Sequence, residues 1–467
     1  MEDRLLQEEE NSKGAKIVSF YNEKTDLVPF IIGKLKEQND NIKYFIDFYI
    51  YEEYHWQLKD EFYIKKYIQE FCEDINIDSK QYKYYKKVDD LFEQAKLDLY
   101  TEMEPKKNLL NFKNGTLELD TMQFREHRRE DYLFYCLPYD YDMEAKCNKW
   151  EAFLDEVLPQ KDLQLAFQEA VAYPLSNLHL EKMSFVTGGG RNGKSLALSV
   201  IAYVLGEKNV SHVTLEQIVK NDGKGIYQML NKLINITFEC SANILNSSAF
   251  KSYVSGEALT VRKLYNNEYT STNYPQTIIA SNSIPQSSDF SEGYYRRFNF
   301  IPFDVTIPKD KINPNLKEEL CVEAPGIMQW ILEGIIRLRE NKRFTKCETI
   351  EKLQNEYRIE SDNVCSFLFE NNYTQSNTKK MLFSSLYREF EDYCQEYNYK
   401  PLGKKNFKQR LAKLNYEIKY CTGNNLFIWI EKKNNNEETT KIIVEVPEKK
   451  ENKENDSLFD MSKKCPF

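Results

Sequence analysis

The sequence has no surplus of positive charge. Its 64 Lys and Arg residues are outnumbered by 73 Asp and Glu residues, which gives a formal net charge of −9 and an isoelectric point near 5.4. A protein whose whole surface binds nucleic acid carries the opposite sign, so that class is excluded. Any contact with nucleic acid must therefore be confined to a local patch of cations.

The sequence is also poor in features that mark membrane, metal and disulfide proteins. No apolar run approaches the roughly 18 residues of a membrane span, and the acidic N-terminus, MEDRLLQEEE, does not resemble a secretory signal. There are only four His residues, and the ten Cys residues form no CxxC pair. This argues against a zinc site and a disulfide framework. We expect a cytoplasmic protein with reduced thiols and no membrane contact.

What the chain does have is length and apolar side chains. Its 467 residues are 41% hydrophobic and 14% aromatic, which predicts about two to four globular domains. Between residues 183 and 303 short apolar runs alternate with helical patterns, as is typical of an α/β sheet with crossovers. We expect strands at 183–187, 232–238, 277–281 and 298–303, and, upstream, a hairpin at Asn114 and Gly115.

Helical periodicity dominates on both sides of this region. In the N-terminal part the clearest helix is expected at 61–73. In the C-terminal part we expect helices at 349–369, 382–397 and 404–414, followed by strands at 416–421 and 426–430. Three helices followed by a hairpin are the outline of a winged helix. The tail from residue 432 is rich in Asn, Glu and Lys and is expected to be disordered.

A glycine-rich segment follows the first of the expected strands. Residues 188–195 read GGGRNGKS and match G-x-x-x-x-G-K-[ST], directly before a helical run at 196–205. In such a loop, backbone N–H groups point at a polyphosphate, glycine permits positive φ, and the helix N-terminus favours negative charge. We expect Lys194 to bind ATP phosphates and Ser195 to ligate Mg²⁺. The expected ATP-binding residues are Gly188, Gly189, Gly190, Arg191, Asn192, Gly193, Lys194 and Ser195.

Polar residues at the ends of later strands are candidates for catalysis. Glu239 follows an apolar strand and is suited to polarise the attacking water and to help hold Mg²⁺. Asn282 ends the next strand, where an amide can sense a γ-phosphate. Arg296 and Arg297 precede another strand and are suited to stabilise phosphate charge, either of them in trans from a neighbouring subunit. The alternatives are an ordinary strand-end carboxylate and a surface arginine pair in salt bridges.

Two local groups of cations are candidates for DNA binding. Lys251, Arg262 and Lys263 lie between Glu239 and Asn282, and the alternation at 260–265 indicates a β-hairpin that projects cations towards a phosphate backbone. The basic strip at 400–413 is predicted to form a helix suited to a DNA groove. Its candidate contacts are Lys404, Lys405, Lys408 and Arg410. For both groups a solvated charged surface is the alternative.

Taken in order, these residues resemble a superfamily 3 helicase, of the branch that contains poxvirus primase-helicases and replication proteins of phages and bacterial mobile islands. The phosphate loop, Glu239, the segment 251–263, Asn282 within ASNSIP and the arginines within GYYRRF follow the family's order. The resemblance covers most of residues 105–430 and is less distinct over 1–104. One departure is Phe238, which stands where many members have a second acid.

The resemblance implies an α/β fold: an AAA+-like P-loop ATPase core, a helical N-terminal region and a C-terminal winged-helix domain. The implied parts are a mainly helical domain at 1–104, a helicase-preceding domain at 105–160, the ATPase domain at 161–342, the winged helix at 343–431 and the tail at 432–467. It also implies a homo-hexameric ring, ATP and Mg²⁺ between subunits, and Lys263 on a hairpin that tracks single-stranded DNA.

The expected function is that of an ATP-dependent replicative DNA helicase or initiator of a phage or mobile element. The alternative is an origin-binding ATPase switch or scaffold without processive unwinding. A small-molecule kinase fits the phosphate loop but not the hairpin cations or the arginine pair. Residues 1–104 show no paired-carboxylate metal motif, so primase activity is not expected. Short motifs in the tail, such as DSLF at 456–459, weakly resemble peptides that bind replication partners.

The substitution Glu239→Gln tests the catalytic carboxylate. An amide cannot accept a proton from water, so the variant should still bind ATP while its turnover is lost. Binding of a fluorescent ATP analogue and release of phosphate measure the two steps separately. Turnover at the wild-type rate would exclude Glu239 as the base.

Overall fold

The computed structural model describes residues 6–10, 16–20, 27–77, 79–83, 85–220, 222–238, 240–263, 268–282, 284, 291–397, 399–421, 423 and 425–433. Glu239 and the tail motifs therefore lie outside the described residues. The chain divides into two compact units. Unit 1 comprises Met1–Pro285 and Arg296–Ile350, and unit 2 comprises Gln286–Tyr295 and Glu351–Phe467.

The N-terminal part of unit 1 combines helices with a sheet that the sequence patterns did not predict. Its helices are α1 (Leu27–Gln38), α2 (Glu61–Asp74), α3 (Ser79–Tyr82) and α4 (Tyr85–Asp98), of which α2 confirms the helix expected at 61–73. The antiparallel sheet is formed by β3 (Ile42–Phe45), β4 (Asp47–Glu52) and β5 (His55–Lys59); β1 (Leu6–Glu10) pairs with β2 (Lys16–Phe20).

The unpredicted sheet has unusual turns. Glu53 and Tyr54 join β4 to β5 with φ of 45° and 70°, a conformation that two-residue hairpin turns require and that Asn or Gly usually supplies. Because neither residue is a typical turn former, no hairpin could be predicted at these positions from local pattern. By contrast, the hairpin expected at Asn114 and Gly115 is confirmed, between β6 (Leu109–Phe112) and β7 (Gly115–Glu118).

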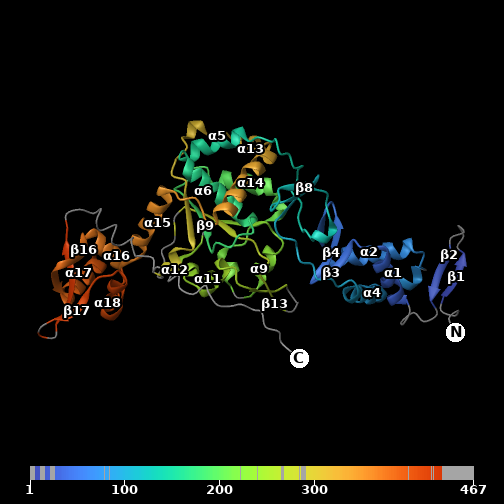
Figure 1. Cartoon of the computed structure of the whole chain (residues 1–467). Helices are drawn as coiled ribbons and strands as arrows, with labels where there is room; N and C mark the ends of the chain where they lie inside the picture. The colour runs from blue at the N-terminus through green and yellow to red at the C-terminus, as the bar shows by residue number, and fades with distance from the viewer. Residues whose placement is uncertain are drawn as a thin grey trace, which may run out of the picture. The chain divides into compact units, whose positions relative to one another are not determined.

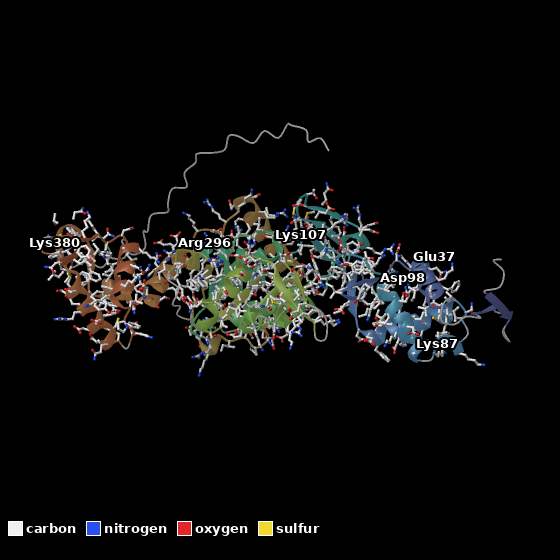
Figure 2. All side chains as sticks on the ribbon, turned by 90° about the horizontal axis from the view of Figure 1, so that it is seen from below. Glu37, Lys87, Asp98, Lys107, Arg296 and Lys380 are labelled. Atoms are coloured by element: carbon white, nitrogen blue, oxygen red, sulfur yellow. The ribbon has the colours of Figure 1, made fainter. Side chains whose placement is uncertain are left out.

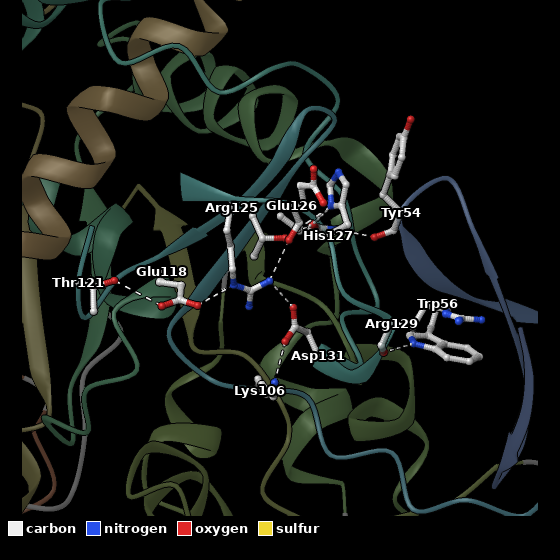
Figure 3. Close-up of polar contacts among 12 residues, drawn as sticks. Tyr54, Trp56, Lys106, Glu118, Thr121, Arg125, Glu126, His127, Arg129 and Asp131 are labelled. Carbon is white, nitrogen blue, oxygen red and sulfur yellow. Dashed lines mark hydrogen bonds and ion pairs between the residues drawn. The ribbon is translucent and has the colours of Figure 1, made fainter. Parts of the chain in front are cut away.

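A buried charge holds the segment around this hairpin together. The side chain of Asp131 is fully buried and forms ion pairs with Arg125 Nη1 at 2.8 Å and with Lys106 Nζ at 2.9 Å. Arg125, in β8 (Gln123–Arg125), also donates through Nε to Glu118 at 2.6 Å. Figure 3 shows this chain of contacts, with Arg125 between the two carboxylates. Since a buried carboxylate is tolerated only when paired, the network fixes β7, β8 and the following turn in one arrangement.

The centre of unit 1 is a five-stranded parallel sheet. Its strands are β9 (Met183–Thr187), β10 (Val210–Ser211), β11 (Ile234–Phe238), β14 (Thr277–Ser281) and β15 (Phe298–Pro302), in the order β10-β11-β14-β9-β15. All four expected strands are confirmed, whereas β10, with two residues, is too short to leave a pattern. In a parallel sheet the carboxyl ends lie at one edge, so the segments after β9, β11 and β14 meet there.

Helices surround this sheet. They are α5 (Asn148–Val157), α6 (Lys161–Ala172), α7 (Lys194–Leu205), α8 (Leu215–Val219), α9 (Lys224–Met229), α10 (Ala242–Leu245), α11 (Ser248–Val254), α13 (Leu316–Cys321) and α14 (Ala324–Asn341). Figure 1 shows α6 and α14 side by side. Arg337 of α14 donates to the fully buried Glu169 of α6 at 2.6 Å, and both helices contribute to the main apolar core. A short antiparallel pair, β12 (Leu259–Val261) and β13 (Tyr269–Ser271), precedes β14.

Unit 2 has its own apolar core. Its elements are α12 (Glu292–Tyr295), most of α15 (Glu348–Ser361), α16 (Asn363–Glu370), β16 (Tyr373–Leu382), α17 (Phe383–Glu396), α18 (Lys404–Lys413), β17 (Ile418–Cys421) and β18 (Asn425–Lys432). The antiparallel sheet has the order β16-β18-β17. The helices expected at 382–397 and 404–414 and the final hairpin are confirmed. Strand β16 was not predicted.

The prediction of a single helix at 349–369 is wrong, because the helix ends before Asp362 and a second helix begins after it. The carboxylate of this residue caps α16 by accepting from the backbone N–H of Val364 at 2.9 Å. It is fully buried and also forms an ion pair with Arg410 of α18. Arg410 therefore faces the interior of unit 2 and is not available to a DNA groove, which corrects its assignment as a DNA contact.

Within the described part of the chain, no helix is both long enough and apolar enough to cross a membrane.

The substitution Arg410→Met should destabilise unit 2. It leaves the carboxylate of Asp362 buried without a counter-charge, and breaking a pair in this way costs about 3 kcal/mol or more. Hydrogen exchange of α16 and α18, followed in the full chain, should show the loss of protection. The matched control Lys405→Met changes an exposed side chain of the same helix and should stay within about 0.5 kcal/mol of wild type. Equal protection in the two variants would contradict the burial of this pair.

Candidate nucleotide site and nucleic-acid interface

The loop at 188–193 connects β9 to α7 in a conformation that depends on glycine. Gly188, Gly190 and Gly193 have φ of 148°, 101° and 82°. A Cβ on Gly188 would lie 2.2 Å from the carbonyl oxygen of Phe303, and Asn192 donates to that same oxygen at 2.8 Å. Side chains larger than hydrogen are therefore excluded at Gly188, and the loop is held against the segment that follows β15. Its last residue, Gly193, is the N-cap of α7.

Lys194 lies at the start of α7 and its side chain is buried within this loop. Its Nζ donates to the carbonyl oxygen of Gly188 at 2.5 Å, to Asn192 Oδ1 at 3.0 Å and to Asn282 Oδ1 at 3.4 Å. The residue is only 5% exposed, and burial lowers its pKa. All three partners are neutral oxygens. The ammonium thus sits in a polar, partly dry environment that an anion would stabilise.

The strand order accounts for the contact between Lys194 and Asn282. Strand β14 is the direct neighbour of β9, and Ser281 pairs with Thr187, so the residues that follow both strands meet. The sequence predicted both residues for one site, and the structure brings them together. Ser195, the next residue of α7, is exposed. On the other side of β14, strand β11 ends in Phe238, which is 50% exposed, directly before Glu239.

Among the described residues, no group of three or more His, Cys, Asp and Glu side chains is arranged to hold a metal ion. Of the two expected Mg²⁺ contacts, the hydroxyl of Ser195 lies at the loop and Glu239 lies outside the described residues. Ser195 and Glu239 alone would supply few ligands. Such a pair fits a cation that receives most of its ligands from a triphosphate and water, as Mg²⁺ commonly does.

The two arginines before β15 have different surroundings. The side chain of Arg296 is 64% exposed and pairs with Glu181 at 2.9 Å. Arg297 is half-buried and donates to Ser255 Oγ at 3.3 Å. Figure 2 labels Arg296 among the side chains on the surface.

Sequence reasoning missed a buried residue that connects three strands of the sheet. Asn235, in β11, is fully buried. Its Oδ1 accepts from Ser211 Oγ at 2.9 Å and from the N–H of Val213 at 2.8 Å, while its Nδ2 donates to Thr277 Oγ1 at 3.0 Å. One amide thus connects β10, β11 and β14. The asparagine inside the largely apolar run LINITF was the sequence feature that could have indicated a buried hydrogen-bonding role.

The hairpin expected around 260–265 is present as the antiparallel pair β12 and β13, and residues 264–267 lie outside the described residues. Arg262 is 46% exposed and pairs with Glu268 at 3.3 Å. Lys263 forms an ion pair with Asp47 of β4. Lys251 lies apart from both, half-buried on α11.

In unit 2, cations gather on two elements. Lys404 and Lys405 are exposed in the first turn of α18, which contains no acidic residue, and Lys408 lies over the ring of Tyr420 at 5.4 Å. Lys380 of β16 is exposed and lies 4.8 Å from the ring of Phe427 (Figure 2). Three of the four cations predicted on α18 therefore remain at the surface, and Arg410 does not.

Three family patterns match consecutive parts of the chain. Residues 32–159 match a family described as D5 N terminal like, residues 186–297 match a family of unknown function, and residues 359–459 match a family described as poxvirus D5 protein-like. The second match covers the glycine-rich loop, Asn282 and both arginines, and the third covers α18.

Curated relatives come from large DNA viruses. The chain is 23% identical over 206 residues to a protein named a candidate helicase from Acanthamoeba polyphaga mimivirus, covering 42% of this chain and 22% of the relative. It is 22% identical over 335 residues to a candidate helicase of Invertebrate iridescent virus 3, covering 61% and 34%. It is 21% identical over 355 residues to a candidate primase of an African swine fever virus isolate, covering 62% and 35%. The chain thus spans between 22% and 35% of the length of these relatives.

The fold is similar to that of the C-terminal region of NrS-1. Two apo structures of this region superpose with a TM-score of 0.50 at 13% and 14% identity, covering 87% and 86% of this chain and 99% and 100% of theirs. The order of the family matches agrees with the order of motifs that the sequence showed. The chain therefore matches, in this order, families described as D5 N terminal like and poxvirus D5 protein-like, and together with its relatives named as helicases and primases it fits the helicase and primase branch of superfamily 3.

Proposed function

We propose that the chain is an ATPase that drives DNA unwinding during replication of a virus, phage or mobile element. The observation that carries this proposal is Lys194, a buried ammonium surrounded by neutral oxygens of a glycine loop at the carboxyl edge of a parallel sheet. A triphosphate would supply the missing negative charge, together with the field of the α7 N-terminus. The relatives named as helicases support the coupling to DNA.

We assign the following roles to the residues at the carboxyl edge of the sheet. The loop and Lys194 bind the β- and γ-phosphates, and Ser195 with Glu239 positions Mg²⁺, which neutralises phosphate charge when bound. Glu239 accepts the proton of the attacking water, and Asn282, already bonded to Lys194, orients the γ-phosphate. These roles place the reaction in an AAA+-like P-loop core.

The site would be completed by a second subunit. Arg296 points to solvent with 64% of its side chain exposed, whereas Arg297 is held by Ser255. An arginine that acts in trans must be accessible to a neighbour, so Arg296 is our candidate for the finger, with Arg297 as its support. A homo-hexameric ring with an ATP site at each subunit boundary is the assembly that this arrangement favours.

DNA would contact two surfaces. The hairpin β12–β13 would place Arg262 and Lys263 on a single strand within the ring, and Lys251 of α11 would be a further contact. From α16 onward, unit 2 has the element order helix, strand, helix, helix, strand, strand with the sheet order β16-β18-β17, and this order supports a winged helix. Its helix α18 would present Lys404, Lys405 and Lys408 to duplex phosphates.

Removal of the Lys194 side chain tests the central claim. Wild-type protein should hydrolyse ATP, more rapidly with single-stranded DNA, and displace a strand from a forked duplex. In Lys194→Ala the hydrolysis rate should fall by about 100-fold or more, because the phosphates lose their cation. Steady-state phosphate release and strand displacement are the measurements.

Two controls make this result specific. Lys220→Ala removes an exposed lysine of the same unit, and its hydrolysis rate should match that of wild type. Lys194→Met should unfold no more easily than wild type, because a buried charge is costly to retain. Hydrolysis by Lys194→Ala at the wild-type rate would reject the site. DNA-stimulated hydrolysis by wild type without strand displacement would favour the alternative, an origin-binding ATP switch.

The salt dependence of duplex binding tests α18. Each lysine that contacts a phosphate contributes about 0.9 to the slope of log K against log salt concentration. The combined change Lys404→Ala, Lys405→Ala and Lys408→Ala should therefore reduce the slope by about two to three. Fluorescence anisotropy over a range of salt concentrations gives this number.

A triple variant with the same net charge serves as the control. It replaces Lys66, Lys220 and Lys352 by Ala; their side chains are 65%, 74% and 77% exposed and are distant from α18 in sequence. Its salt slope should equal that of wild type. Equal slopes in both triple variants would remove α18 from the DNA interface.

A further inference from the structure

The hairpin lysine that we place on DNA has an acidic partner within its own chain. Lys263 Nζ forms an ion pair with Asp47, which lies 216 positions away at the start of β4. The second carboxylate oxygen of Asp47 accepts from the hydroxyl of Tyr227, on α9, at 3.0 Å. The Asp47 side chain is 12% exposed and that of Lys263 is 38% exposed. The pair is thus partly shielded from solvent.

Other polar groups join the N-terminal sheet to the same place. Asn231, which follows α9, donates to the hydroxyl of Tyr49 at 3.4 Å and accepts from Asn273 at 3.1 Å. Burial, and then the charge of Asp47, raises the pKa of Tyr227 above its usual value and that of Tyr269 to about 12. The phenol of Tyr227 therefore stays neutral and remains a donor. All of these contacts are hydrogen bonds or ion pairs. Water can therefore replace the hydrogen bonds, and another anion can replace Asp47 beside Lys263.

The backbone at Asp47 is itself unusual. Ile46, a β-branched residue, has a φ of 67°, which lies in the left-handed region that such residues avoid. A conformation of this kind persists only where the surrounding structure imposes it, and it is found most often at functional positions. The tight turn between β3 and β4 brings Asp47 to the first position of its strand.

Arg262, the cation next to Lys263, has a partner of a different kind. Arg262 pairs with Glu268, which belongs to the same hairpin, and both side chains are about half exposed. That pair moves with the hairpin and is accessible to solvent. The pair of Lys263 with Asp47 instead connects the hairpin to a separate sheet, so it must break if the hairpin moves relative to that sheet.

We propose that Asp47 is an intramolecular competitor for nucleic acid, which occupies Lys263 until a phosphate replaces it. This inference rests on the proposed function, because it assumes that Lys263 contacts DNA. A carboxylate and a phosphodiester each carry one negative charge, so Lys263 can neutralise only one of them at a time. DNA binding would then release the hairpin from the N-terminal sheet, and the hairpin would be held in place while no DNA is bound.

The test compares Asp47→Asn with wild type in the full chain, using a fluorescent oligothymidylate as the single-stranded probe. Asparagine retains an oxygen that accepts from Tyr227 but lacks the charge that holds Lys263. The affinity for the probe should rise by about threefold to tenfold, the range expected for loss of one partly buried competing pair. In a Lys263→Ala background the same change should have no effect, because the two residues act through one contact.

Glu268→Gln is the matched control, since it removes one negative charge from the hairpin itself at an exposed pair. It should change the affinity by less than about twofold. A comparable gain in Glu268→Gln and Asp47→Asn, or a gain from Asp47→Asn that persists with Lys263→Ala, would indicate a general charge effect and overturn the inference.

The outcomes also separate this inference from the proposed function. If Lys263→Ala binds the probe as wild type does, the hairpin is not a DNA contact, and that part of the proposed function fails. If Lys263→Ala binds more weakly while Asp47→Asn binds as wild type does, the proposed function stands and only the competitor role of Asp47 is rejected.

Discussion

The candidate site depends on the buried charge of Lys194. This side chain is almost fully buried, and its hydrogen-bond partners among the described residues are the neutral oxygens of Gly188, Asn192 and Asn282. Such a position is unfavourable for a cation in an empty protein, and burial accordingly lowers the pKa of the side chain. The arrangement becomes favourable when an anion enters. The loop glycines, the neighbouring strand β14 and the N-terminus of α7 are all arranged around this position.

Elsewhere the described structure balances its buried charges. Three carboxylates are fully buried, and each has an arginine partner: Asp131 with Arg125, Glu169 with Arg337, and Asp362 with Arg410. These pairs lie where a rigid framework is needed, at a hairpin, between two helices and at a helix break. Lys194 differs from these pairs, because its partners among the described residues are neutral oxygens, which is why we propose it as the charge that binds a ligand. The ion pair of Lys263 with Asp47 is intermediate, since it is paired but only partly shielded.

Much of the site could be predicted because its signals are local. The glycine pattern at 188–195 requires neighbouring residues in a fixed order, and the strands that precede it and Asn282 are apolar runs with clear ends. The elements that were missed have no such local pattern. Strand β10 is two residues long, β16 is polar through its middle, and the turn from β4 to β5 is made by Glu53 and Tyr54 rather than by Gly or Asn. For β10 and β16, pairing with strands farther along the chain overrides local preference.

The sequence by itself determined the α/β class of the core, the glycine-rich loop between strand and helix, and the resemblance to a family, because these depend on residue order and on short-range periodicity. The tertiary structure alone decided which cations remain available. Arg410 and Lys408 lie two positions apart on one helix, but Arg410 is bound to buried Asp362 while Lys408 stays near the surface. Likewise, Lys263 meets Asp47 only because the chain folds back over 216 positions. The sequence shows which side chains are charged. The partner of each charge depends on which distant segments the fold brings into contact.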